Sequence, residues 1–153
     1  MTTDPQALLQ KLFDSPFKFA IASKLRDLGP DVCPHLEAAL AEGTQDAAAL
    51  RQCAAILLHF GNHGGVPYLL QDLTAGGDAP FSALRLADAG ITEALDPIAQ
   101  LLAGDMMRAL PYEAFVLVDA HQKFAPIPEE LKQHLLAQVP DKLRADLKQA
   151  LDK

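Results

Sequence analysis

The sequence predicts an all-helical protein, an α-solenoid of about four helical hairpins with a capping helix at each end. The first observation is a regular spacing of prolines, at intervals of 33, 30 and 31 residues: Pro34, Pro67, Pro97 and Pro128. The second is a glycine a few residues ahead of the first three prolines. The third is the spacing of apolar residues by three and four on both sides of these turns, which is the period of an α-helix. Such a repeat is typical of stacked hairpins that bury one another's apolar faces.

Each unit is expected to consist of a helix, a tight turn and a second helix. A glycine after the first helix can adopt the left-handed conformation that ends the helix, because it has no Cβ to clash. A proline in the first turn of the second helix gives up no intrahelical N–H bond. We therefore expect units at residues 16–42, 45–75, 79–104 and 108–138. The fourth unit lacks the glycine and has His121 to Phe124 in its place.

The units are also expected to share a continuous apolar core. In the first helices the apolar stripe runs through Phe17, Ile21, Leu25 and Leu28, and then Leu50, Ala54, Leu57 and Leu58. In the second helices it runs through Leu36 and Leu40, Leu69 and Leu73, and Ile98, Leu101 and Leu102. One hairpin cannot bury such a stripe alone, so successive hairpins must stack.

Two flanking segments, 5–13 and 140–152, are expected to be the capping helices. Asp4 followed by Pro5 is a helix-start signal, and the leucines that follow make one apolar face. In the second segment leucines recur every four residues among polar ones: Leu143, Leu147 and Leu151. A single narrow stripe predicts a single buried side, which suits a helix that stops the stacking.

This pattern resembles the HEAT-repeat family, in the short bacterial form of about thirty residues per unit that occurs in phycobilisome lyases. The resemblance covers about residues 16–139. It is carried by Gly61 six residues before Pro67, with Val66, Leu69 and Leu73, and by Leu86, Ala89, Gly90, Glu93, Ala94 and Leu95. The resemblance implies a helical solenoid that serves as a binding platform, and it implies no particular chemistry.

Composition bounds the class of protein. The chain has 153 residues, 50% hydrophobic and 22% charged, which suits one soluble globular domain. No apolar run approaches the roughly 20 residues of a membrane span, and the first residues lack the pattern of a secretion signal, so we expect a cytoplasmic protein. Cys33 and Cys53 lie among apolar helical neighbours and are expected to be buried structural thiols.

The charge distribution is the best indication of function. The net charge is -7, and residues 77–122 hold seven acidic side chains against Arg85 and Arg108. This stretch would repel phosphate backbones and attract basic partners, so nucleic-acid binding is disfavoured. The acidic candidates for partner binding are Asp88, Glu93 and Asp96. The alternative is a solvated acidic face that only keeps the protein soluble.

A partner is expected on the second helices, which line the concave surface of a HEAT-like stack. The outward positions on these helices are Glu37, Gln71, Asp72, Gln100, Glu130 and Lys132. Binding grooves usually contain aromatic or arginine anchors, and only Tyr68 and Tyr112 fit that description. The interpretation we favour for each tyrosine is a position at the edge of the core with a solvated hydroxyl.

No residue pattern predicts catalysis, a metal or a cofactor. His59 and His63 are four apart, a spacing that could align two imidazoles on one helix. The glycine between them, Gly61, is expected to end the helix and break that register. No third ligand and no nucleophile with a nearby base is evident, so we expect neither a catalytic site nor a metal site.

Three classes of function follow. The leading interpretation is a non-enzymatic scaffold that binds a protein partner of basic character on its concave or acidic middle surface. A sharper form is an immunity or inhibitor protein that blocks a basic enzyme or toxin. The alternatives are an enzyme-associated protein similar to bilin lyases, as the family resemblance implies, and a nucleic-acid processing protein, which the charge disfavours.

Overall fold

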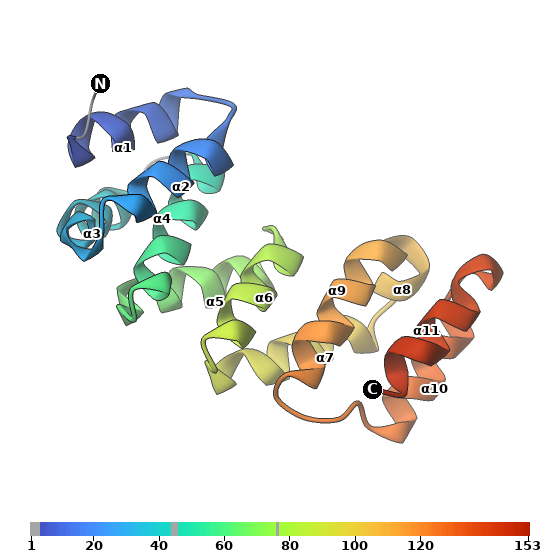
Figure 1. Ribbon diagram of the computed structural model, residues 1–153. Helices are drawn as coiled ribbons and strands as arrows, with labels where there is room; N and C mark the ends of the chain where they lie inside the picture. Colours follow the sequence, from blue (N-terminus) through green and yellow to red (C-terminus); the bar gives the residue numbers. More distant parts are fainter. Residues whose placement is uncertain (1–3, 44–45, 76) are drawn as a thin grey trace. The chain divides into compact units, whose positions relative to one another are not determined.

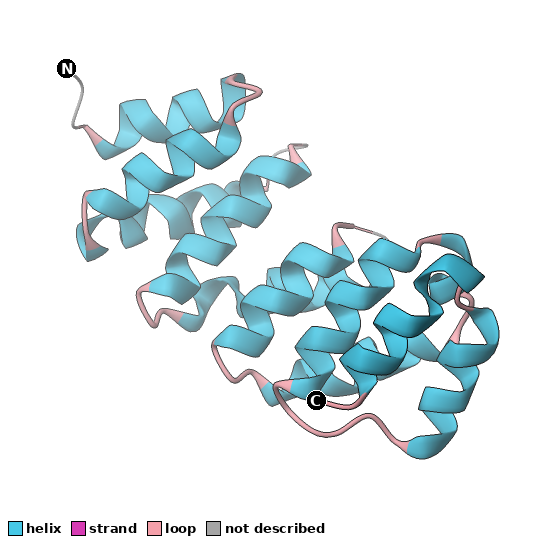
Figure 2. Cartoon of the chain, turned by 45° about the vertical axis from the view of Figure 1, so that its right-hand side comes forward, coloured by secondary structure: helices cyan, strands magenta, loops and turns pink. Residues whose placement is uncertain are grey.

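The computed structural model describes residues 4–43, 46–75 and 77–153. Across these residues the protein is about 80% helix and contains no strand, which confirms the all-α prediction (Figure 2). The α-helices are α1 (Pro5–Asp14), α2 (Lys18–Asp27), α3 (Cys33–Glu42), α4 (Ala47–His59), α5 (Val66–Thr74), α6 (Ala79–Asp88), α7 (Leu95–Ala103), α8 (Met106–Ala109), α9 (Pro111–Gln122), α10 (Glu129–Gln138) and α11 (Arg144–Leu151). Short 3-10 helices precede α3, α5, α7 and α11, at Pro30–Val32, His63–Gly65, Thr92–Ala94 and Asp141–Leu143.

The chain separates into two compact units, Met1–Gln71 and Asp72–Lys153, which we call unit 1 and unit 2. In unit 1, α1 packs against α2 and α3, and α4 packs against the same two helices (Figure 1). The side chains at the centre of this packing are fully buried: Leu12, Leu25, Leu36, Ile56 and Leu57. The apolar spacing of three and four residues therefore produces the core that it predicts in this unit.

Unit 2 is built around α9. Helices α6, α7, α8 and α11 all pack against it, and α7 also packs against α10. Its fully buried side chains come from several of these helices: Leu86, Ile98, Leu102, Met107 and Leu117. The first helices of two successive hairpins, α6 and α9, are thus in contact, and so are the second helices, α7 and α10.

The glycines end the first helices as predicted. Gly29, Gly61 and Gly90 have positive φ angles of 92°, 75° and 72°. At the end of α4, the N–H of Asn62 donates to the Leu57 carbonyl at 2.9 Å and the N–H of Gly61 donates to the Leu58 carbonyl at 3.0 Å. These paired bonds satisfy carbonyl groups that the helix end leaves without partners.

The prolines lie at the starts of the second helices, also as predicted. Pro34 and Pro67 are the second residues of α3 and α5, Pro97 is the third residue of α7, and Pro128 directly precedes α10. The sequence patterns did not reveal the 3-10 helix between each glycine and the following α-helix. The patterns also missed α8 (Met106–Ala109), a four-residue helix that overlaps the start of the hairpin expected at residues 108–138.

Both flanking segments contain the expected helices. Asp4 caps α1 by accepting from the Gln6 N–H at 3.2 Å, and α1 buries Leu8, Leu9 and Leu12. At 140–152 a 3-10 helix leads into α11, and the three leucines that recur every four residues are buried. Among the helices of the described ranges, none has the length and apolar content that a membrane span needs.

One apolar prediction is wrong. Phe17, expected in the core stripe of the hairpin predicted at residues 16–42, is 74% exposed. It lies one residue before α2 with φ -94° and ψ 57°, so its side chain does not follow the helical register of Ile21 and Leu25. Ser15 accepts from the Phe17 N–H at 3.0 Å, which fixes this local turn.

Candidate functional site

In unit 2 three helices end on the same side. Lys123, directly after α9, places its Nζ 2.7 Å from Asp88 Oδ1 at the last residue of α6. Gln122 Nε2, at the end of α9, donates to the Ala150 carbonyl of α11 at 2.9 Å. The carboxyl-terminal ends of α6, α9 and α11 are therefore neighbours, and the three helices run in the same direction (Figure 1).

The second helices begin on this side, because short connections lead into them from α6 and α9. The 3-10 helix Thr92–Ala94 leads from α6 into α7, and residues 123–128 lead from α9 into α10. We call this side the turn end of unit 2. Its charged residues, all exposed, are the carboxylates Asp88, Glu93, Asp96, Asp119, Glu129, Glu130 and Asp152 and the lysines Lys123 and Lys153.

Helix electrostatics explain part of this charge. Asp96 lies in the first turn of α7, and Glu129 and Glu130 lie in the first turn of α10. A carboxylate there is stabilised by the partial positive charge of a helix amino terminus. Asp88 and Asp119 lie in the last turns of α6 and α9, where the helix dipole disfavours negative charge. Helix formation therefore does not account for these two carboxylates.

Lys123 is the lysine of this surface that pairs with a carboxylate, Asp88. The hydrogen bond from its ammonium to Asp88, followed by the Asp88 charge itself, raises the pKa of Lys123 above its usual range. Asp119 adds a smaller attraction in the same direction. Lys123 thus neutralises one carboxylate locally, and the negative charge at the turn end remains in large excess.

The structure brings together only some of the residues predicted to bind a partner. Asp88, Glu93, Asp96 and Glu130 share the turn end of unit 2. Gln100 is exposed in the middle of α7, and Lys132 is half-buried on α10. The others, apart from Asp72, belong to unit 1: Glu37, Tyr68 and Gln71.

Asp72 requires a correction, because it does not point outward. Its side chain is 8% exposed, and Ser82 Oγ donates to its Oδ2 at 2.7 Å. The N–H of Gly77 also donates to the Asp72 carbonyl at 3.1 Å, so this residue organises the turn between α5 and α6. The sequence gives no sign of this role, since the partner Ser82 lies on the following helix.

The unit 1 residues are engaged in local contacts. Glu37 Oε1 accepts from Asn62 Nδ2 at 2.8 Å, which ties α3 to the turn after α4. Tyr68 is half-buried and its hydroxyl donates to the Ala47 carbonyl at 3.2 Å. These contacts favour the interpretation of Tyr68 as a tyrosine at the edge of the core over its interpretation as an aromatic anchor for a partner. Gln71 is exposed.

The histidines show no metal site. α4 ends at His59, and His63 lies in the following 3-10 helix, so the two do not share a helix. Within the described ranges, no group of three or more potential ligand side chains is close enough to hold a metal ion. His121 is buried, at 3% exposed, and its Nδ1 donates to the Ala125 carbonyl at 3.1 Å.

Tyr112, the other tyrosine considered as an anchor, is 67% exposed at the start of α9, on the side of unit 2 away from the turn end, so it does not lie at the core edge. Two surface features were not predicted, and the first is Leu110 beside it, which is 50% exposed. In unit 1 a groove runs between α1 and α3, lined by apolar, amide and carboxylate side chains. The groove could not be found from the sequence, because its walls come from helices separated by α2.

A scan against protein-family models, a search of curated proteins and a search of solved structures each found no match for this chain.

Proposed function

We propose that this protein is a non-enzymatic interaction module of the α-solenoid type, whose turn end in unit 2 binds a basic segment of a protein partner. The observation that carries the proposal is the convergence of exposed carboxylates from α6, α7, α9, α10 and the 3-10 helix Thr92–Ala94 on one side of unit 2, where, among the described residues, only Asp88 is paired with a lysine, Lys123. Carboxylates such as Asp88 and Asp119, placed where they do not favour their own helices, support a role in recognition.

The packing supports the solenoid part of the proposal. In a solenoid of hairpins, each first helix packs on the next first helix, and each second helix on the next second helix. In unit 2, α6 packs on α9 and α7 packs on α10. The glycine and proline positions of the hairpins agree with the resemblance to HEAT repeats, a family that serves mainly as binding platforms.

Electrostatics select the class of partner. A dense negative surface attracts lysine- and arginine-rich segments and raises their rate of association. The same surface repels phosphate backbones, so a nucleic acid is not the proposed partner. An inhibitor of a basic enzyme would use the same surface, and it is a specific form of this proposal.

The test is affinity capture from the native lysate with three versions of the full chain. One carries Asp88→Asn, Glu93→Gln and Asp96→Asn at the turn end. The matched control carries Asp105→Asn, Glu113→Gln and Asp146→Asn, which remove the same charge from exposed positions elsewhere in unit 2. We expect the unchanged chain and the control to capture the same basic proteins, and the turn-end variant to lose them. Capture that is equal for all three would contradict the proposal.

A third variant gives an effect of opposite sign. Lys123→Gln frees Asp88 and removes a positive charge from the turn end, so it should tighten binding of a basic partner. A decalysine peptide in a fluorescence anisotropy titration serves as the probe before a partner is known. Affinity should rise for Lys123→Gln, fall for the turn-end variant, and weaken with added salt in every case. Unchanged affinity for Lys123→Gln would show that the peptide binds elsewhere.

A further inference from the structure

Unit 1 contains a groove of about 400 Å³ between α1 and α3. Pockets of this size accommodate a small ligand or a protruding side chain. Its apolar surface comes from both helices: Leu9 and Phe13 on α1, and Ala38 and Ala39 on α3. Leu9 and Ala39 are buried, whereas Phe13 is half-buried and Ala38 is exposed. The groove therefore offers an apolar lining next to solvent.

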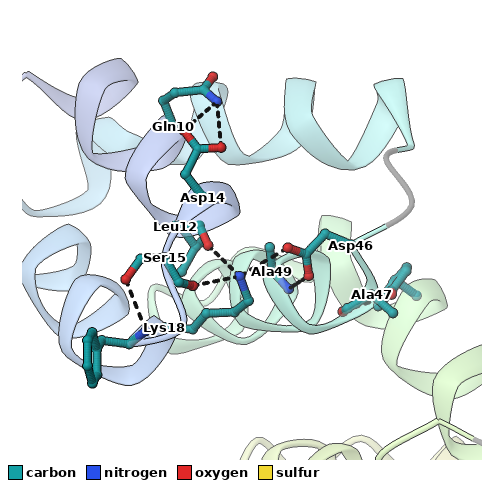
Figure 3. Close-up of polar contacts among 10 residues, drawn as sticks. Gln10, Leu12, Asp14, Ser15, Lys18, Asp46, Ala47 and Ala49 are labelled. Atoms are coloured by element: carbon teal, nitrogen blue, oxygen red, sulfur yellow. Dashed lines mark hydrogen bonds and ion pairs between the residues drawn. The ribbon is translucent and has the colours of Figure 1, made fainter.

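Amide groups on α1 add hydrogen-bonding capacity to one wall. Gln6 Oε1 accepts from His35 Nδ1 at 3.1 Å, which links α1 to α3 across the groove. Gln10 Nε2 donates to both carboxylate oxygens of Asp14, at 3.3 and 3.2 Å (Figure 3). In this arrangement the Gln10 carbonyl oxygen accepts no bond from any described residue, so it remains available as an acceptor.

The two carboxylates that line the groove differ in their surroundings. Asp46 Oδ2 accepts from Lys18 Nζ at 3.0 Å, and its Oδ1 caps α4 by accepting from the Ala49 N–H at 3.0 Å (Figure 3). Glu42 makes no hydrogen bond or ion pair to any residue in the described ranges, and no lysine or arginine lines the groove. The charge of Asp46 is therefore matched, and the charge of Glu42 is not.

The position of Glu42 on its helix increases the local demand for a cation. Glu42 is the last residue of α3, where the helix dipole and the final carbonyl groups are themselves negative. A positive group held there would interact with the carboxylate and the helix terminus together. A neutral ligand would gain neither of these attractions, and an anionic ligand would be repelled by both.

We propose that this groove binds an arginine side chain of a partner segment, with the guanidinium at Glu42 and the aliphatic part along Leu9 and Ala39. Arginine fits better than lysine because its planar head can donate two hydrogen bonds to a carboxylate and can stack on an aromatic ring such as Phe13. This inference rests on the proposed function, since it assigns a second contact, in unit 1, to the same basic partner.

The test uses the full chain, labelled with ¹⁵N, and the peptide acetyl-Gly-Arg-Gly-amide followed by NMR. The same peptide with citrulline is the matched ligand, because citrulline keeps the shape of arginine and removes the charge. We expect shifts at the amides of α1 and α3, with the citrulline peptide and Glu42→Gln each weakening binding by about three- to tenfold. Glu113→Gln, the same change at an exposed position of α9 away from the turn end, should leave the affinity unchanged.

A second variant separates groove occupancy from charge. Ala38→Leu should fill the groove and abolish the shifts, and its exposed position on α3 means that the fold should tolerate it. Circular dichroism and the thermal midpoint check that both variants remain folded. An absence of shifts in α1 and α3, equal binding by the Glu42→Gln variant, or tighter binding of free spermidine than of the arginine peptide would overturn the inference.

The failure of this inference is distinguishable from the failure of the proposed function. If a captured basic partner depends on Asp88, Glu93 and Asp96 but not on Glu42, the groove assignment is wrong and the proposed function stands. If the arginine peptide depends on Glu42 and no basic protein is captured, the groove is an arginine site and the proposed function is wrong.

Discussion

The connection after α4 in unit 1 and the connection after α9 in unit 2 join helices by different means. After α4, Gly61 takes the left-handed conformation and the chain turns at once into a 3-10 helix. After α9 no residue has a positive φ. Instead the Phe124 and Ala125 N–H groups both donate to the His121 carbonyl at 3.0 Å, and the His121 ring bonds back to the Ala125 carbonyl.

The comparison shows two ways to end a helix. A glycine supplies the required backbone conformation with no help from other residues. Without a glycine, the chain uses a buried polar side chain and a longer connection, in which Ile127 is buried and Pro126 and Pro128 restrict the backbone. The first solution depends on local conformation, and the second depends on burial of His121 in unit 2.

The largest expected effect is on thiol chemistry, and it reports on unit 1 alone because both cysteines lie there. Burial raises the pKa of Cys53 to about 12, and burial followed by the charge of Glu37 raises the pKa of Cys33. At pH 8 we expect Cys53 to react with Ellman's reagent about a thousandfold more slowly in the folded protein than in urea. Rapid labelling of Cys53 in the folded protein would show that unit 1 opens readily.

The next effect concerns close packing beside the unit 1 turn. A Cβ at Gly65 would lie 2.6 Å from Ala54 Cα, so Gly65→Ala should lower the free energy of unfolding by about 3 kcal/mol. At Gly64 the nearest atom, at 3.0 Å, belongs to the Asn62 side chain, which can move. Gly64→Ala is therefore the control, with an expected loss under about 1 kcal/mol in a urea titration. Equal losses would remove the packing explanation.

The glycine turns of the two units should respond alike to loss of the left-handed residue. Gly61→Ala and Gly90→Ala add no steric contact within 4 Å, so each should cost about 1–2 kcal/mol from backbone strain alone. Asparagine tolerates this conformation better than alanine does, so Gly61→Asn should recover part of the loss. Thermal melts of the three variants provide the measurement, and an unchanged midpoint for Gly61→Ala would contradict the comparison.

The glycine-free connection should depend on the His121 ring. Replacing His121 with leucine leaves the Ala125 carbonyl without this donor, which should cost about 1–2 kcal/mol in urea unfolding. Lys123→Gln removes only an exposed ion pair in the same connection and should shift the midpoint much less. If His121→Leu leaves the urea midpoint unchanged, burial of Ile127 and the backbone restriction by Pro126 and Pro128 are sufficient to fix the connection.

The smallest effect is a pH dependence located in unit 1. Burial acts to raise the pKa of Asp46, but the Ala49 N–H bond and Lys18 outweigh it and lower the pKa below 3.8. Because the pKa of Asp46 is lower in the folded protein than in the unfolded chain, its carboxylate stabilises the fold at pH values above the unfolded-state pKa. This stabilisation is lost as the pH falls through the folded-state pKa. We expect the protein to lose less than about 1 kcal/mol of its free energy of unfolding through Asp46 below pH 4, because the Asp46–Lys18 pair is partly exposed. Asp46→Asn should remove this slope; an unaltered slope would assign it to other carboxylates.

Helix positions could be predicted from local signals, because a glycine, a proline or an apolar period acts within a few residues of itself. The same signals failed where a distant partner decides the outcome. Asp72 looks like an outward polar residue until Ser82 is placed beside it, and His121 looks exposed until the α9–α10 connection folds over it. Phe17 is the opposite case: it was expected to be buried, but it lies before the first residue of α2 and its side chain is exposed.

By itself, the sequence determined the all-helical fold, the glycine ends of α2, α4 and α6, the burial of both cysteines and the acidic character of the middle of the chain. Only the tertiary structure decided which carboxylates share the turn end of unit 2, and that α1 and α3 enclose a groove at Glu42. The reason is physical: helix ends depend on backbone conformation over a few residues, whereas a surface depends on which helices pack together.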